Sequence, residues 1–194
     1  MIDDFYLIGS ALIETNWRGK EQLGEEVINE HGDDVNDDLA FGDGPRHGPF
    51  SSILLRKGSL APIQFQYVFR LLSLTQEIDG VRENHEVQLI RNVVREVDHQ
   101  FLLFRPIQSL DVVDFSKSMI EEWPPGTKLD PWHDPRGSEF FQPAIKWDEL
   151  PKGIKAFRLA DWPGASNIVV SDAYKRMFES GMESGYLSFT RLAL

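Results

Sequence analysis

Cysteine is absent from the 194-residue sequence. Its absence excludes disulfide frameworks, thiolate zinc sites and cysteine nucleophiles. A chain without thiols suits a reducing compartment, although periplasmic proteins can also lack cysteine. We therefore expect the protein to be cytoplasmic.

Long apolar runs are absent as well. No stretch of about 18 apolar residues occurs, so we expect no helix that spans a membrane and no membrane partner. Residues 1–10 are apolar in patches, but Asp3 and Asp4 stand where a secretory signal has positive charge. We therefore expect a first strand here rather than a leader peptide.

Positive charge is scarce, with 20 lysine and arginine residues against 31 aspartates and glutamates and a net charge of −11. This balance repels the phosphate backbone, so we expect no nucleic-acid partner. A surface of one sign can steer a basic protein into contact. The commoner role of net charge is to keep a protein in solution, and both interpretations remain open.

Apolar residues are nonetheless plentiful, at 41% of the sequence with thirteen Phe and five Trp. Such a content is typical of a globular fold, and a chain of this length can bury one sizeable core. We expect one domain over residues 1–194. Its class is α+β, a mostly antiparallel sheet with a few packed helices.

Catalytic signatures are also missing. The sequence contains no nucleophile elbow and no Walker phosphate loop, and residues 42–47 lack the third glycine of a dinucleotide fingerprint. The five histidines are scattered without ligand spacing. We expect no catalytic residues, no cofactor and no metal. The enzymatic alternative is a hydrolase near Trp132-His133-Asp134, with Glu139 as a further acid or base.

An acidic segment comes closest to a metal-binding pattern. Four aspartates lie close together in it: Asp33, Asp34, Asp37 and Asp38. A calcium loop that starts at Asp34 fails, because Leu39 replaces the turn glycine and Pro45 replaces the bidentate glutamate. We interpret the segment as a solvated acidic loop.

The first half of the chain gives mixed signals of secondary structure. We predict a strand at 5–13, a helix at 19–29, a long surface loop at 31–49, a short strand at 53–55 and a buried helix at 63–74. The last segment also alternates like a strand, through Ile63, Phe65, Tyr67 and Phe69. Its length favours the helix.

The second half is clearer. Residues 86–96 and 101–106 predict two strands joined by a tight turn at Asp98-His99, and 112–115 continue the pattern. Residues 123–147 predict an ordered irregular region with one helix near 137–141.

The closing unit predicts strand, strand, helix, strand. Residues 156–159 and 168–170 are the first two strands. We expect Ser171 to cap the following helix and Gly181 to end it in a left-handed conformation. A last strand follows Gly185.

Three segments of this half resemble a known family. Residues 86–90, 101–106 and 110–118 are similar to the central region of immunity family eleven of bacterial polymorphic toxin systems, a domain first catalogued as of unknown function. Residues 157–159, 168–172 and 185–189 resemble the end of that family, although Ser184-Gly185 stands where a Thr-Gly pair is expected. The resemblance covers residues 86–194. It implies a protein without catalytic residues that binds and neutralises a cognate toxin in the cytoplasm.

Charge complementarity then suggests a basic toxin, for example a nuclease whose phosphate-binding cleft the acidic loop would occupy. We assign the contact surface to the loop from Asp33 to Asp43, with Trp132. The assigned residues are Asp33, Asp34, Asp37, Asp38, Asp43 and Trp132. The remaining alternative to immunity protein and hydrolase is a regulatory module that binds some other protein.

This assignment predicts that alanine at Asp33, Asp34, Asp37 and Asp38 together weakens toxin binding, because the carboxylates that attract the basic surface are removed. Calorimetric titration of the purified toxin with both forms of the protein tests it. Unchanged affinity would show that the surface is wrongly assigned.

Overall fold

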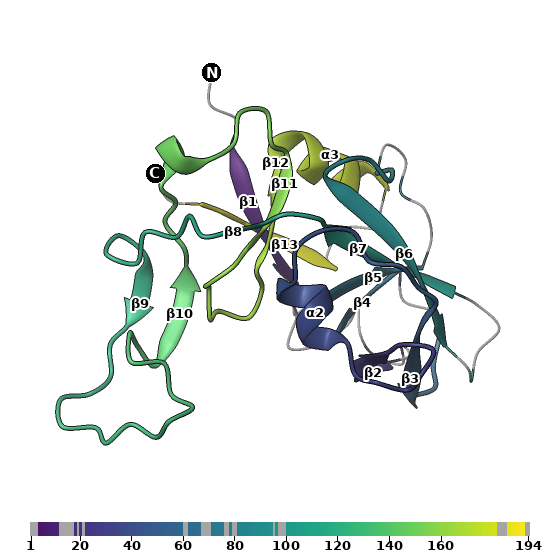
Figure 1. Cartoon of the computed structure of the whole chain (residues 1–194), viewed down its shortest axis with the longest axis horizontal. Coiled ribbons are helices and arrows are strands. Elements are labelled where there is room, and N and C mark those ends of the chain that lie inside the picture. Colours follow the sequence, from purple (N-terminus) through teal and green to yellow (C-terminus); the bar gives the residue numbers. More distant parts are fainter. Residues whose placement is uncertain are drawn as a thin grey trace.

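Short β-strands make up most of the secondary structure (Figure 1). The computed structural model describes residues 4–11, 18, 20, 22–59, 62–66, 71–75, 78, 81–94, 96, 100–181 and 186–192. The strands are β1 (Phe5–Ser10), β2 (Gln22–Ile28), β3 (Phe50–Arg56), β4 (Ile63–Gln66), β5 (Leu71–Leu74), β6 (Val87–Val94), β7 (Gln100–Pro106), β8 (Ser109–Leu110), β9 (Met119–Glu121), β10 (Glu139–Gln142), β11 (Ala156–Leu159), β12 (Ile168–Ser171) and β13 (Leu187–Arg191). The helical segments are α2 (Asn36–Phe41), α3 (Asp172–Gly181) and the 3₁₀ turn η1 (Trp147–Glu149). No helix in these ranges is long and apolar enough to cross a membrane.

The larger sheet has the order β2-β3-β6-β7-β5-β4, and its described pairings are antiparallel apart from β3 with β6. It curls until its edge strands meet, because Gln66 Nε2 in β4 donates to the carbonyl oxygen of Gly24 in β2 at 2.7 Å. Gln66 also bonds to the hydroxyl groups of Ser52 and Ser73, and Asn92 donates to Ser52. This buried polar network fixes the near-barrel curl of the sheet.

The second sheet has the order β13-β1-β12-β11-β8 and joins the two ends of the described chain. Its strands alternate between two buried faces. Ile168 and Val170 point into a core shared with the curled sheet and α3, whereas Val169 points into a second core formed mainly by residues 110–162, with Phe5, Leu7 and Leu192. The sheet is therefore the middle layer of the molecule, with apolar side chains on both sides.

Helix α3 covers the edge of the first core with one face. Tyr174 and Phe178 are buried four residues apart, and the Phe178 ring lies edge-on to Phe104 with centroids 5.1 Å apart. The predicted cap of this helix is wrong, because the Ser171 hydroxyl is buried and has no hydrogen-bond partner among the described residues. Gly181 is also not left-handed; its lack of a side chain instead leaves room for Ile78.

Several predicted elements are confirmed. The strands at 53–55, 86–96 and 101–106 correspond to β3, β6 and β7, and β6 and β7 form an antiparallel pair. The closing unit corresponds to β11, β12, α3 and β13. The α+β class with a mostly antiparallel arrangement also agrees, although helix is scarcer than expected.

Three predicted helices are wrong. Residues 19–29 contain β2, residues 63–74 contain β4 and β5, and residues 137–141 contain most of β10. Leu23 and Val27 mislead because a spacing of four residues fits both a helical turn and one face of a strand. The loop predicted at 31–49 is interrupted by α2, whose Leu39 and Ala40 pack into a small core beside β2 and β3.

Some predictions concern positions outside the described residues or gain only partial support. The strand at 5–13 is confirmed as β1 up to residue 10, while residues 12–13, Asp98-His99 and Ser184-Gly185 lie outside the described residues. The pattern at 112–115 yields one isolated bridge, from Val113 to Ile145, instead of a strand.

Gly181 provides a test of the packing at the end of α3. A Cβ at this position would overlap the branched side chain of Ile78, which is itself buried. We expect Gly181→Ala to lower the free energy of unfolding by about 1–3 kcal/mol, despite the better helix propensity of alanine. Urea denaturation measures this change in the free energy of unfolding. The control Ser180→Ala, at an exposed neighbouring position, should change stability by less than about 0.5 kcal/mol; equal effects would contradict the packing.

Candidate functional site

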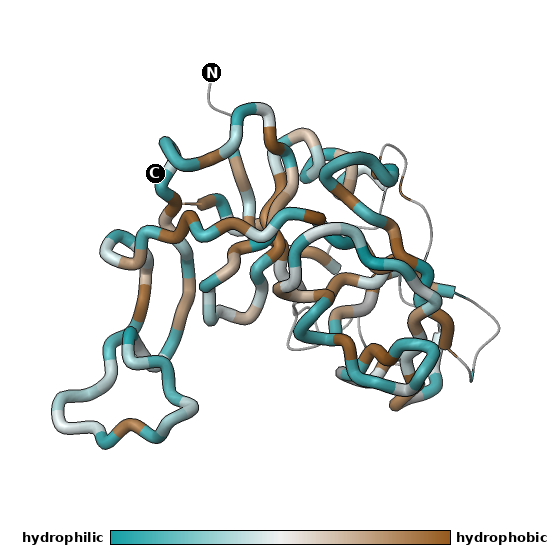
Figure 2. The backbone as a smooth tube through the Cα atoms, viewed as in Figure 1, coloured by the Kyte–Doolittle hydropathy of each residue, from teal (hydrophilic) through white to brown (hydrophobic). Residues whose placement is uncertain are grey.

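A two-stranded arm extends away from the rest of the molecule (Figure 1). Strands β9 and β10 pair with each other, and residues 122–138 connect them as a long loop at the far end. Figure 2 shows hydrophobic segments on both strands and a mainly hydrophilic loop with one hydrophobic point. The side chains of the two strands alternate between a half-buried face and an exposed face.

The inner face of the arm anchors it to the second core. Ile120 and Phe140 lie directly opposite each other and pack against this core, with the Phe140 ring edge-on to Trp162 at 5.6 Å between centroids. Arg136 adds a polar attachment. Its guanidinium lies 4.0 Å from the centre of the Phe115 ring and its Nη1 donates to Asp161 at 2.5 Å.

The loop has a fixed internal structure. Trp123 Nε1 donates to the Asp134 carbonyl oxygen at 2.7 Å, and the Trp123 ring lies 4.8 Å from the His133 ring. His133 Nδ1 accepts the Asp130 N–H at 3.0 Å. Arg136 bonds to the Asp134 carboxylate, which keeps the pKa of Asp134 below its ordinary value and that of Arg136 above it. Asp134 therefore stays ionised at neutral pH, and these contacts hold the loop in one shape.

Trp132 is displayed on this fixed loop with 77% of its surface exposed. Its ring lies 5.9 Å from the His133 ring of the same loop. Met119 and Phe141 on the strands are 56% and 51% exposed. A large aromatic side chain on a well-held loop can contribute strongly to affinity when a partner buries it.

The predicted acidic surface divides into exposed and structural residues. Asp33 and Asp34 lie in an exposed turn, where Asp33 accepts from the Asn29 side chain and Asp34 accepts the Asn36 N–H. Asp37 is exposed in the first turn of α2. These three aspartates lie at the exposed surface of the molecule.

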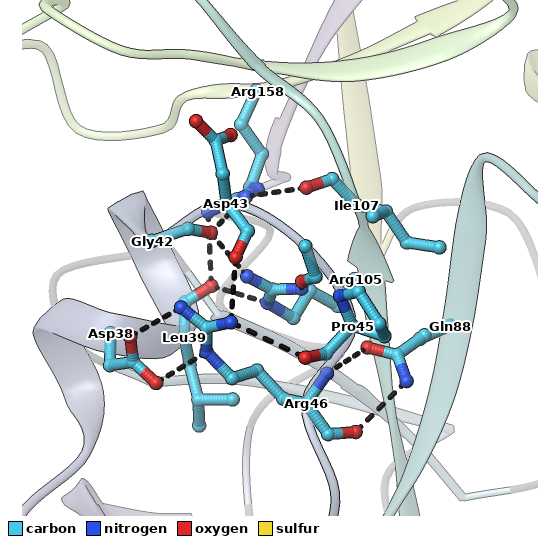
Figure 3. A network of polar contacts seen from close by, with 11 residues as sticks. Asp38, Leu39, Gly42, Asp43, Pro45, Arg46, Gln88, Arg105, Ile107 and Arg158 are labelled. Atoms are coloured by element: carbon cyan, nitrogen blue, oxygen red, sulfur yellow. Dashed lines mark hydrogen bonds and ion pairs between the residues drawn. The ribbon is translucent and has the colours of Figure 1, made fainter.

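Asp38 and Asp43 instead hold the fold together (Figure 3). Asp38 forms a two-pronged ion pair with Arg46, and Asp43 Oδ1 accepts the Ser109 N–H at 2.9 Å. Arg46 Nη1 also donates to the Asp43 carbonyl oxygen at 2.6 Å. Any change at Asp38 therefore alters structure as well as charge, and the acidic surface is better tested at Asp33, Asp34 and Asp37.

Two buried arginines complete this network. Arg105 in β7 donates to the carbonyl oxygens of Leu39, Gly42 and Gly44, and Arg158 in β11 donates to those of Leu39, Gly42, Pro106 and Ile107. Burial lowers the pKa of Arg105 to about 10 and that of Arg158 to about 9, helped by the positive field of neighbouring arginines. Both guanidinium groups stay protonated at neutral pH. They tie the loop after α2 to both large sheets.

The predicted site residues are thus not brought together. Trp132 belongs to the arm, whereas α2 lies against the body of the molecule (Figure 1). Sequence reasoning identified Trp132 but missed Met119 and Phe141. The sequence contains little signal for them, because neither Met-Ile-Glu at 119–121 nor Glu-Phe-Phe-Gln at 139–142 alternates between apolar and polar residues, and the connection between them is far longer than a hairpin turn.

The residues of the hydrolase alternative have structural partners. His133 and Asp134 shape the arm loop through Asp130 and Arg136, as described above. Described residues line a cleft of about 480 Å³ beside Arg46 and Arg91 and a cleft of about 350 Å³ beside Glu86 and Tyr174. Neither is lined by Trp132, His133 or Asp134. Within the described ranges, no three acidic or histidine side chains are grouped as metal ligands.

Comparisons with known proteins give no match, either to the models of protein families or to curated proteins.

Because Arg105 and Arg158 share buried carbonyl acceptors, we expect Arg158→Met to cause a large loss of stability. The carbonyl groups of Pro106 and Ile107 lose the donor that satisfies them, so we expect the free energy of unfolding to fall by about 2–5 kcal/mol. Urea denaturation tests this. Arg176→Ala, which breaks an exposed ion pair with Asp172, serves as the control and should lose less than about 1 kcal/mol. Similar losses in both variants would mean that the buried contacts contribute little.

Proposed function

We propose that this chain is a non-catalytic immunity-type protein, which binds a toxin by direct contact and neutralises it in the cytoplasm. The observation that carries the proposal is the projecting arm with the exposed Trp132. The resemblance of residues 86–194 to immunity family eleven supplies the class of partner.

The arm has the properties of a contact surface in a tight complex. Affinity in such complexes comes mainly from a few aromatic or arginine side chains that become fully desolvated. Trp132 is exposed on a loop whose backbone is held by the Trp123, His133 and Arg136 contacts, so burial of its ring by a partner requires little ordering of the chain. Met119 and Phe141 extend the apolar area along the strands.

Charge adds the preference for a basic partner. Residues 119–142 hold five carboxylates against one lysine and one arginine, within a chain of net charge −11. Opposite charges accelerate association and disfavour wrong partners. A nuclease toxin has the required basic surface, because it binds phosphate. The exposed aspartates Asp33, Asp34 and Asp37 offer a second acidic contact on the body of the molecule.

The direct test is co-expression with the product of the adjacent reading frame. We expect a one-to-one complex on co-purification and recovery of growth in cells that express that product. A chain that neither binds it nor restores growth would refute the immunity function.

Trp132 is the residue to change in that complex. We expect Trp132→Ala to weaken binding by about 30-fold, the effect of losing a central aromatic contact of about 2 kcal/mol. The fold should be unaffected because the side chain is exposed. Surface plasmon resonance measures the affinity, and circular dichroism checks the fold. Leu55→Ala, at another exposed apolar position, should leave the affinity unchanged; equal losses would contradict the role of the arm.

A further inference from the structure

The outer face of the arm combines apolar and acidic side chains. Strand residues alternate between faces, and Ile120 and Phe140 occupy the inner one. Met119, Glu121, Glu139 and Phe141 therefore share the outer face, and all four are exposed. A register irregularity between Phe140 and Gln142 lets Phe141 stand out from the pair of strands.

Two glutamates lie directly opposite each other on this face. The register pairs Glu139 with Glu121, so their Cβ atoms are separated by about 5 Å, as in any directly opposed pair. Like charges in this arrangement destabilise a sheet. Glu122 follows at once and is also exposed. The free protein therefore carries a local repulsion that a cation between the two carboxylates would relieve.

We propose that this outer face binds a cationic segment of the partner protein, with a lysine or arginine side chain placed between Glu121 and Glu139 and apolar side chains against Met119 and Phe141. An arginine fork suits two adjacent carboxylates, since it donates along several directions at once. The inference rests on the proposed function, because it extends the same interface from Trp132 along the strands.

Charge selects this occupant over a second copy of the chain. Two arms packed face to face would bring four glutamates together in a protein that already has a net charge of −11. A basic segment instead neutralises the pair and covers the two apolar side chains in one contact. The face therefore discriminates by charge, while Trp132 supplies an apolar anchor.

The test uses a short synthetic peptide in which arginine and leucine alternate, and a matched peptide with glutamine in place of arginine. We expect the arginine peptide to shift the backbone amide resonances of residues 119–121 and 139–142 in the nuclear magnetic resonance spectrum of the full chain. The glutamine peptide should leave them unmoved. Shifts confined to the turn at Asp33 and Asp34, equal shifts with both peptides, or no shift at the arm would overturn the inference.

The double variant Glu121→Gln, Glu139→Gln gives two readouts of opposite direction. Removing the repulsion should raise the melting temperature of the free protein by about 1–4 °C. The same change should lower the affinity for the arginine peptide about tenfold at low salt, and high salt should erase the difference. Glu26→Gln, at an exposed position of β2, is the control and should change neither quantity. An unchanged peptide affinity in the double variant would overturn the inference.

The peptide measurements are independent of the toxin. A chain that binds the arginine peptide at the arm but fails to bind the product of the adjacent reading frame would refute the immunity function and retain the cationic site. A chain that binds that product as tightly after the double substitution would retain the function and refute the site.

Discussion

Two buried guanidinium groups hold the loop after α2 to both large sheets. Arg105 comes from the curled sheet and Arg158 from the middle sheet, and both donate to the same carbonyl oxygens of Leu39 and Gly42. A cation without a direct carboxylate partner is tolerated there because carbonyl dipoles surround it and Asp38 and Asp43 lie nearby. The relative position of the sheets, and with it the second core that anchors the arm, depends on this shared set of acceptors.

The arm differs from this buried arginine network, because many of its side chains are exposed to water. Its inner face is part of a core, but its outer face leaves aromatic, aliphatic and acidic side chains in water. The opposed glutamates lower the stability of the free protein, and the exposed tryptophan contributes little to its core. Their presence on an element that is rigidly attached through Phe140 and Arg136 fits a surface whose favourable contacts are made with another molecule.

The sequence predicts elements well where local and tertiary preferences agree. The β-branched run 168–170 favours a buried strand, and the apolar segments 86–96 and 101–106 form strands β6 and β7 as predicted. Leu23 and Val27 are ambiguous because their spacing satisfies two periods, and pairing with β3 decides the outcome. The acidic segment was identified, yet its division into exposed Asp33 and structural Asp38 depends on Arg46, which only the folded chain brings near. Trp132 was identified by residue type, while the opposed glutamates depend on a strand register that composition does not encode.

The position of β1 has a consequence for how the protein is made. This strand lies between β12 and β13, so both of its neighbours come from the far end of the sequence. During synthesis the middle sheet must wait until residues 168–191 have left the ribosome, and until then Ile8 and its apolar neighbours have no sheet partners. The curled sheet uses only residues 22–106 and can assemble earlier. Folding on the ribosome is thus expected to proceed in two stages, with a chaperone-sensitive interval between them.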